Sequence, residues 1–164
     1  MPEVYRNDQK IACVGEDWIR RLKDAAAAST LRRSRLCLHL SNDDAVQEMI
    51  IALCRDVLFR PHRHTNKSES FHIIEGELDV IVFDAHGNVE RSIHMGPPGS
   101  GATYCYRLST SAWHAILPRT EFVVFHETTA GPFVPGQPAQ FAPWAPVEPA
   151  ALRTFLEANA AVNR

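Results

Sequence analysis

The stretch "FRPHRHTNKSESFHIIEGEL", residues 59–78, holds three of the eight histidines of this chain within eleven positions. Its first two histidines, His62 and His64, are two residues apart, and side chains at this spacing in a strand point to the same side. Both imidazoles can therefore reach one ion. The turn residues "TNKS" follow, and a hairpin across them would return the carboxylate of Glu69 to the two imidazoles. Gly76 then supplies the backbone freedom for a second turn.

A further ligand must come from another part of the chain, and the run "STSAWHAIL" offers His114. Three neutral imidazoles and one carboxylate suit a divalent transition metal. An octahedral ion held by these four groups keeps two positions for substrate, oxygen or water. We therefore predict a divalent metal cofactor, and this ligand set accepts iron, manganese, zinc or nickel.

The surrounding chain is rich in short strands. Between Leu36 and Thr128, nine runs of β-branched and aromatic residues alternate with turn sequences such as "SNDD", "DAHGN" and "GPPGSG". Such spacing without an intervening helix predicts an all-β sandwich or closed barrel. A helix is expected over residues 16–30, where apolar residues recur at helical spacing, and another in "PAALRTFLEANAAV" near the C-terminus.

The segment 131–149 contains six prolines together with three large aromatic residues. Proline interrupts both helices and sheets, so we expect an extended arm that lies against the barrel or against a partner subunit. The chain then divides into an N-terminal helical segment (1–31), a β-barrel (32–130) and a proline-rich arm with a C-terminal helix (131–164).

Composition restricts the kinds of partner. The 164 residues carry a formal net charge of −2, which gives no electrostatic reason for binding nucleic acid or an anionic membrane. With no signal-like N-terminus and no apolar run long enough to span a bilayer, a cytoplasmic location is expected. The four widely spaced cysteines are expected to be small buried residues and not disulfides. The basic run "LRRSRL" is either a solvated segment or an anion-binding cluster.

The histidine motif resembles that of the cupins. The family pattern is His-x-His, three or four residues, Glu, six residues, then Gly, and His62 to Gly76 follows it. The glycine that normally opens the motif is replaced by Asp56. The second cupin motif is degenerate: "YRLSTSAWHAILP" keeps His114 but lacks the Pro-x-Gly turn and the final Asn.

Several longer stretches of residues 32–148 are similar to the WbuC-type cupin-fold metalloproteins; they include "VQEMIIAL", "PHRHTNKSESFHIIEGELDVIVFDAHG", "HETTAGPF" and "FAPWAP". This resemblance implies a double-stranded β-helix (jelly-roll) barrel with flanking N- and C-terminal helices. It also implies metal ligation by His62, His64, Glu69 and His114, a homodimer, and a link to lipopolysaccharide biosynthesis, since some members are encoded among O-antigen genes.

Further residues are candidates for lining a substrate pocket. Tyr104, Tyr106 and Leu108 share one face of their predicted strand, while Cys105 and Arg107 share the other, and the pattern leaves open which face is inward. The candidates are Arg107, which would orient an anionic substrate, Tyr104, and His126 or Glu127 on the last strand, with Gln47 or Glu48 on an early one.

Two classes of function follow. The first is a metal-dependent enzyme that acts on a small polar metabolite, such as a sugar derivative, by Lewis-acid isomerisation or epimerisation or by dioxygenation. The second is a non-catalytic module that binds a metal and a small ligand. A third possibility is a metal-free epimerase with a histidine base, although such an enzyme would not need four ligands. Nucleophile-elbow, phosphate-loop and dinucleotide motifs are absent from the sequence.

Overall fold

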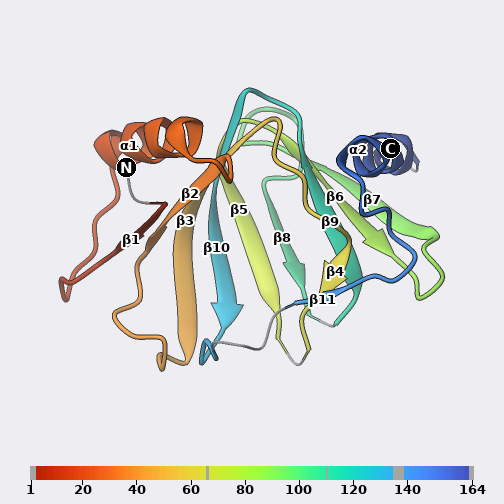
Figure 1. The fold of residues 1–164 in the computed structure, drawn as a ribbon. Coiled ribbons are helices and arrows are strands. Elements are labelled where there is room, and N and C mark those ends of the chain that lie inside the picture. The colour runs from red at the N-terminus through yellow and green to blue at the C-terminus, as the bar shows by residue number, and fades with distance from the viewer. Residues whose placement is uncertain (1–2, 66, 110, 135–138, 163–164) are drawn as a thin grey trace.

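The computed structural model describes residues 3–65, 67–109, 111–134 and 139–162. Its strands form two sheets that pack face to face, closer together at one end than at the other, and a helix lies outside each sheet (Figure 1). The elements are β1 (Val4–Arg6), α1 (Glu16–Ala28), β2 (Arg33–Cys37), β3 (Val46–Cys54), β4 (His62–Arg63), β5 (Glu69–Glu75), β6 (Leu78–Phe83), β7 (Val89–Met95), β8 (Cys105–Leu108), β9 (Trp113–Pro118), β10 (Phe122–Ala130), β11 (Gln140–Phe141) and α2 (Pro149–Ala160).

The strand order shows a jelly roll. One sheet has the order β1-β2-β3-β10-β5-β8, and the other has β11-β4-β9-β6-β7. Strands that are distant in sequence pair with each other, as β3 does with β10 and β4 with β9, and these pairs are antiparallel. The prediction of an all-β double-stranded β-helix with flanking helices is confirmed.

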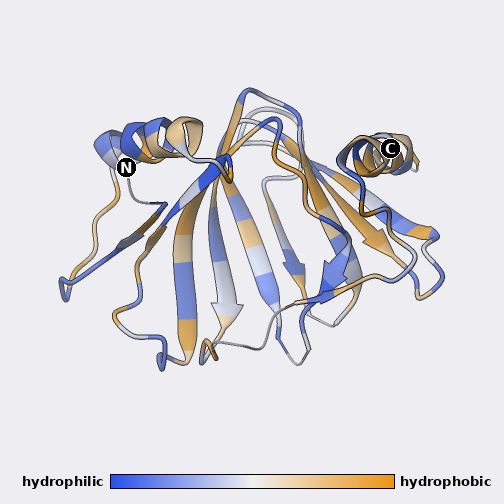
Figure 2. Cartoon of the chain, in the orientation of Figure 1, coloured by the Kyte–Doolittle hydropathy of each residue, from blue (hydrophilic) through white to orange (hydrophobic). Residues whose placement is uncertain are grey.

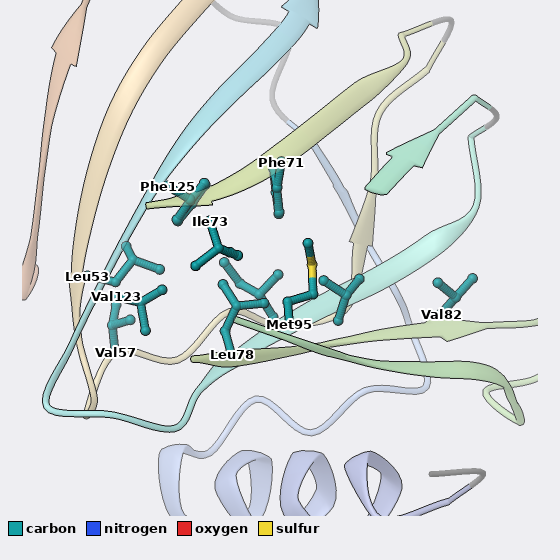
Figure 3. Close-up of a cluster of buried hydrophobic side chains, with 11 residues drawn as sticks. Leu53, Val57, Phe71, Ile73, Leu78, Val82, Met95, Val123 and Phe125 are labelled. Carbon is teal, nitrogen blue, oxygen red and sulfur yellow. The ribbon is translucent and has the colours of Figure 1, made fainter. Parts of the chain in front are cut away.

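The space between the sheets is filled mainly by side chains from alternate strand positions. The two sheets meet in one cluster of buried apolar side chains (Figure 3). One sheet contributes Leu78 and Met95, and they pack against residues of β3, β5 and β10 in the other sheet: Leu53, Phe71, Ile73, Val123 and Phe125. This cluster occupies one part of the barrel interior. The polar residues described below occupy another part.

Each helix covers the outer face of a sheet with a few buried residues. In α1, Leu22 and Ala26 pack on β2 and β3, and the hydroxyl of Ser34 donates to the carbonyl of Leu22. In α2, Leu152 and Leu156 pack on the hydrophobic strands β6 and β9 (Figure 2). No described helix has the length and apolar character needed to cross a membrane.

The turn between β5 and β6 requires glycine. Gly76 has φ of +78°, and a Cβ atom there would lie 2.1 Å from the carbonyl oxygen of Phe122. No L side chain fits at that distance. The glycine of the histidine motif thus permits the turn by which the chain passes from β5 in one sheet to β6 in the other.

The structure differs from the sequence-based expectations in four places. Residues 4–6 form β1, which extends the sheet by parallel pairing with β2. The run "DVLFRPHRH" (56–64), one of the nine runs expected to form strands, contains only the two residues of β4, and the chain before Pro61 is irregular. The hairpin expected across "TNKS" does not form, because β4 and β5 belong to different sheets. The cysteines are all free, but Cys13 and Cys105 are exposed, because Cys105 lies on the outward face of β8.

The proline-rich arm lies against the barrel, which is one of the two arrangements expected for it. Its strand β11 pairs with β4, so Phe141 stands opposite His62. Further along, Trp144 packs against Phe83 of the helix-covered face. Residues 135–138 of the arm lie outside the described residues.

Candidate metal centre

Three histidines from two neighbouring strands meet inside the barrel. His62 of β4 stands directly opposite His114 of β9, and their ring centres are 4.5 Å apart. The ring of His64 lies 5.2 Å from that of His62. One ligand nitrogen from each of these three residues lies within 4.8 Å of the others. That spacing is suited to a shared metal ion, with metal–nitrogen bonds of about 2 Å.

Backbone carbonyls orient two of these imidazoles. Nδ1 of His62 lies 2.9 Å from the carbonyl oxygen of Arg60, and Nδ1 of His114 lies 3.0 Å from that of Ala112. A carbonyl can only accept, so each Nδ1 carries a proton and each Nε2 is directed to the centre. Metal-binding histidines in proteins are commonly held in this way.

The carboxylate of Glu69 completes the group from the opposite sheet. Its Oε1 lies 2.9 Å from Nε2 of His114, and its Oε2 lies 3.6 Å from Nε2 of His64. The hydroxyl of Tyr106, on the neighbouring strand β8, donates to Oε1 at 3.1 Å. The residue is buried, so its orientation is set by these contacts. The structure therefore brings together all four residues that the sequence singles out as ligands.

The electrostatics of the centre are those of a cation site. Burial and the nearby charges of His114 and His64 lower the pKa of His62 to about 4, so this imidazole is neutral at physiological pH. Burial opposes charge on Glu69 and His114 as well, but their mutual hydrogen bond lowers the pKa of Glu69 and raises that of His114. A proton on Nε2 of His114 thus occupies a position at which a bound metal would replace it.

The donor set fits a divalent metal, and the ligands would be His62, His64, Glu69 and His114. Imidazole nitrogens and a carboxylate are ordinary ligands of several first-row ions. Tyr106 would support the carboxylate from outside the ligand set.

The centre opens into a cavity of about 290 Å³ between the sheets. Its walls are apolar at Ile51, Leu53, Phe59, Phe71, Ile116 and Phe125, and charged or polar at Glu3, Arg33, Ser34, Arg35 and Glu127. A largely apolar cavity with a few convergent polar groups is typical of a small-molecule site.

The three residues predicted to line the substrate pocket lie elsewhere. Arg107 is exposed on the outer face of β8, where its guanidinium donates to Ser68 Oγ at 3.0 Å. Tyr104 is also outside and packs against His72. His126 faces outward from β10, with Nε2 3.5 Å from Glu48. In each strand the inward positions are taken by the residues that contact the core, which leaves these side chains on the other face.

The inward residues of these two strands are Tyr106 and Glu127. Glu127 follows Phe125 at a spacing of two and faces the cavity. Burial and then the negative charge of Glu69 raise its pKa to about 8, against the lowering effect of Arg35. The sequence offered it only as an alternative to His126, because both faces of β10 carry apolar residues. Gln47, a further candidate, is buried and donates to backbone carbonyls at Ser41 and Asp44.

Comparisons with known proteins agree with this architecture. No curated protein sequence matches the chain. A solved structure from Klebsiella pneumoniae, described as an uncharacterized conserved protein with a double-stranded beta-helix domain, is 15% identical with a TM-score of 0.50; the match covers 70% of this chain and 82% of that one. This similarity shows the fold alone.

Two other solved structures match smaller parts. The cupin domain of Schizosaccharomyces pombe Cnp3 is 14% identical, with a TM-score of 0.47 and coverage of 60% of this chain and 64% of that chain. An HTH_3 family transcriptional regulator from Vibrio cholerae is 21% identical, with a TM-score of 0.45 and coverage of 61% of this chain and 51% of that chain. This chain thus spans about half to two-thirds of the length of these two proteins.

One protein-family model matches the chain, over residues 14–95. This segment runs from before α1 to the end of β7 and includes three of the four candidate ligands. That segment is half of the chain. The protein is a member of the family described as "Domain of unknown function (DUF6016)".

Proposed function

We propose that this protein is a metal-dependent cupin enzyme that acts on a small polar metabolite bound in the cavity beside the histidines. The observation that supports the proposal most is the convergence of three histidine nitrogens within 4.8 Å, with the Glu69 carboxylate in contact with two of them, at the wall of a 290 Å³ cavity. When bound, a divalent cation would act as a Lewis acid on substrate oxygens.

The protein's own contribution to the chemistry would come from Glu127. Its carboxyl faces the same cavity, and burial together with the negative charge of Glu69 raises its pKa above the ordinary value of a glutamate. A group of this kind is suited to general acid–base catalysis. It would take a proton from a carbon next to a substrate carbonyl and return it to a neighbouring atom; epimerisation would need a second proton donor on the opposite face.

This assignment favours isomerisation or epimerisation, because both reactions move a proton to and from carbon, which is the step that such a carboxyl catalyses. The class of substrate that we propose is a sugar derivative of about monosaccharide size. Its support comes from the size of the cavity, from the polar groups in its wall and from the WbuC-type resemblance of the sequence. On the same resemblance, we propose a role in the synthesis of surface polysaccharide.

The test begins with the metal. Protein purified without a histidine tag should contain close to one equivalent of a first-row metal by elemental analysis. Glu69→Ala should lose that metal and His126→Ala, on the outer face, should keep it. Metal-free wild-type protein with full stability would contradict the proposal.

The reaction is then sought with monosaccharide derivatives and small keto acids in D₂O. NMR would follow deuterium incorporation at carbon, with oxygen uptake recorded in parallel. We expect incorporation with wild-type protein and at least a hundredfold loss with Glu127→Gln, which keeps its metal. Saturable binding without exchange or oxygen uptake would identify a non-catalytic binding module, and oxygen uptake would identify a dioxygenase.

A further inference from the structure

Two arginines of the edge region of the sheet face the cavity. Arg33 and Arg35 alternate along β2 and stand opposite Leu53 and Ile51 of β3. Leu53 belongs to the core between the sheets, and residues directly opposite each other on paired strands share a face. Both guanidiniums are therefore on the inner side of the sheet. Both line the cavity that also contains the three histidines.

These arginines have no ionic partner in the part of the chain that the structure describes. Their neighbour Arg32 forms an ion pair with Asp56 at 3.0 Å, on the other side of the strand. The guanidinium carbon of Arg33 lies over the ring of Phe59, 5.6 Å from its centre. Glu3 also lines the cavity, but its Oε1 accepts a hydrogen bond from the hydroxyl of Ser29 at 2.6 Å.

The positive charge of the two arginines favours the binding of an anion in this part of the cavity. Partial burial and the positive charge of Arg35 lower the pKa of Arg33, while Glu3 acts in the opposite direction. Glu127 also lines the cavity, and the charge of Arg35 acts to lower its pKa. Two cations thus lie at the edge of a partly apolar cavity, on the inner face of the sheet.

We propose that Arg33 and Arg35 form an anion subsite that binds the carboxylate or phosphoryl group of the ligand. Guanidinium groups match the geometry of both oxyanions, which they can hold by paired hydrogen bonds. The rest of the ligand then extends through the cavity toward the histidines. This inference rests on the proposed function for the role of the ligand as substrate, and it narrows the substrate class to sugar acids, sugar phosphates and similar small organic anions.

Anion binding itself does not require the metal, so the two ideas can be tested separately. Isothermal titration calorimetry with malonate, with inorganic phosphate and with neutral malonamide would be carried out on the full chain, before and after treatment with a chelator. We expect one saturable site for malonate or phosphate and none for malonamide. The double substitution Arg33→Gln/Arg35→Gln should weaken anion binding at least tenfold.

Arg107→Gln is the control for the loss of an arginine outside the cavity, because it removes one positive charge from the outer face of β8. Its affinity for malonate should equal that of the wild type. A second variant, Arg35→Lys, keeps the charge and should bind more tightly than Arg35→Gln, which separates loss of the subsite from loss of the fold. Thermal melts would confirm that each variant is folded.

The proposal is overturned if neither anion binds the wild type, or if the double variant binds malonate as tightly as Arg107→Gln does. Metal content is measured on the same samples. Arginine-dependent anion binding by a protein that holds no metal would refute the proposed enzyme and leave the subsite standing. A metal-loaded protein without anion binding would refute the anion subsite and leave the proposed enzyme standing.

Discussion

Replacement of Glu127 by glutamine should change how the stability of this protein depends on pH. The carboxyl has a pKa of about 8 in the folded chain, compared with an ordinary value of 4.5, because it is partly buried in the cavity wall and affected by the negative charge of Glu69. Between these values the unfolded chain loses the proton while the folded chain keeps it. The folded state therefore binds more protons, and its free energy of unfolding falls as the pH rises from 4.5 to about 8.

The magnitude follows from the width of that interval. Each pKa unit corresponds to about 1.4 kcal/mol, so an interval of about 3.5 units amounts to an upper bound of about 5 kcal/mol above pH 8. At pH 7 the corresponding bound is about 3 kcal/mol. Below pH 4.5 both states are protonated and the penalty disappears. The amide introduced by Glu127→Gln does not titrate. The difference in the free energy of unfolding between the variant and the wild type should therefore grow in favour of the variant from pH 4.5 to about 8, and it should be constant below and above that range.

Urea denaturation of chelator-treated protein, at half-unit steps from pH 4 to 9, would measure the difference between the wild type and Glu127→Gln. Other titrating groups are common to both proteins, so they largely cancel in the difference. Glu90→Gln, an exposed substitution on β7, is the control for the loss of one carboxyl. A difference that does not vary with pH, or a wild type that gains on the variant as the pH rises from 5 to 8, would refute the reasoning.

Three other predictions concern the metal centre, a turn and a helix. Tyr106→Phe removes the hydrogen bond to Glu69 and should weaken metal binding by about tenfold or more in competition with a chromophoric chelator, whereas Tyr104→Phe on the outer face should have no effect. Gly76→Ala should lower the free energy of unfolding by about 3 kcal/mol in urea, because the added Cβ would collide with the backbone of Phe122 at a positive φ; a change below about 1 kcal/mol would show that the turn can relax. Leu156→Ala leaves a cavity between α2 and β6 and should cost about 3 kcal/mol, and Thr154→Ala, on the exposed side of the same helix, should cost far less under the same conditions.

Local spacing along the chain was enough to predict several parts of the protein. Strand alternation placed His62 and His64 on one side of the chain. The prediction of a hairpin across "TNKS" was wrong, because β4 and β5 lie in different sheets and Glu69 reaches the imidazoles across the barrel. The breaks between apolar runs located most of the strands; the runs "VQEMIIALC" (46–54) and "VERSIHM" (89–95) coincide with β3 and β7. These features depend on the two-residue period of a strand and on turn chemistry, which a sequence shows directly.

The inward face of each strand, in contrast, was settled only by the packing of the sheets. The run of β10 is apolar on both faces, because α1 covers one side and the opposite sheet covers the other, so its pattern does not distinguish Glu127 from His126. The same ambiguity held for Tyr106 and Arg107 on β8. For Arg33 and Arg35, the pairing of β2 with β3 brings two charged residues to the inner face, and no local pattern records which strands become neighbours. Burial on a given face is a property of the packed sheets, and it exists only once the chain has closed into the barrel.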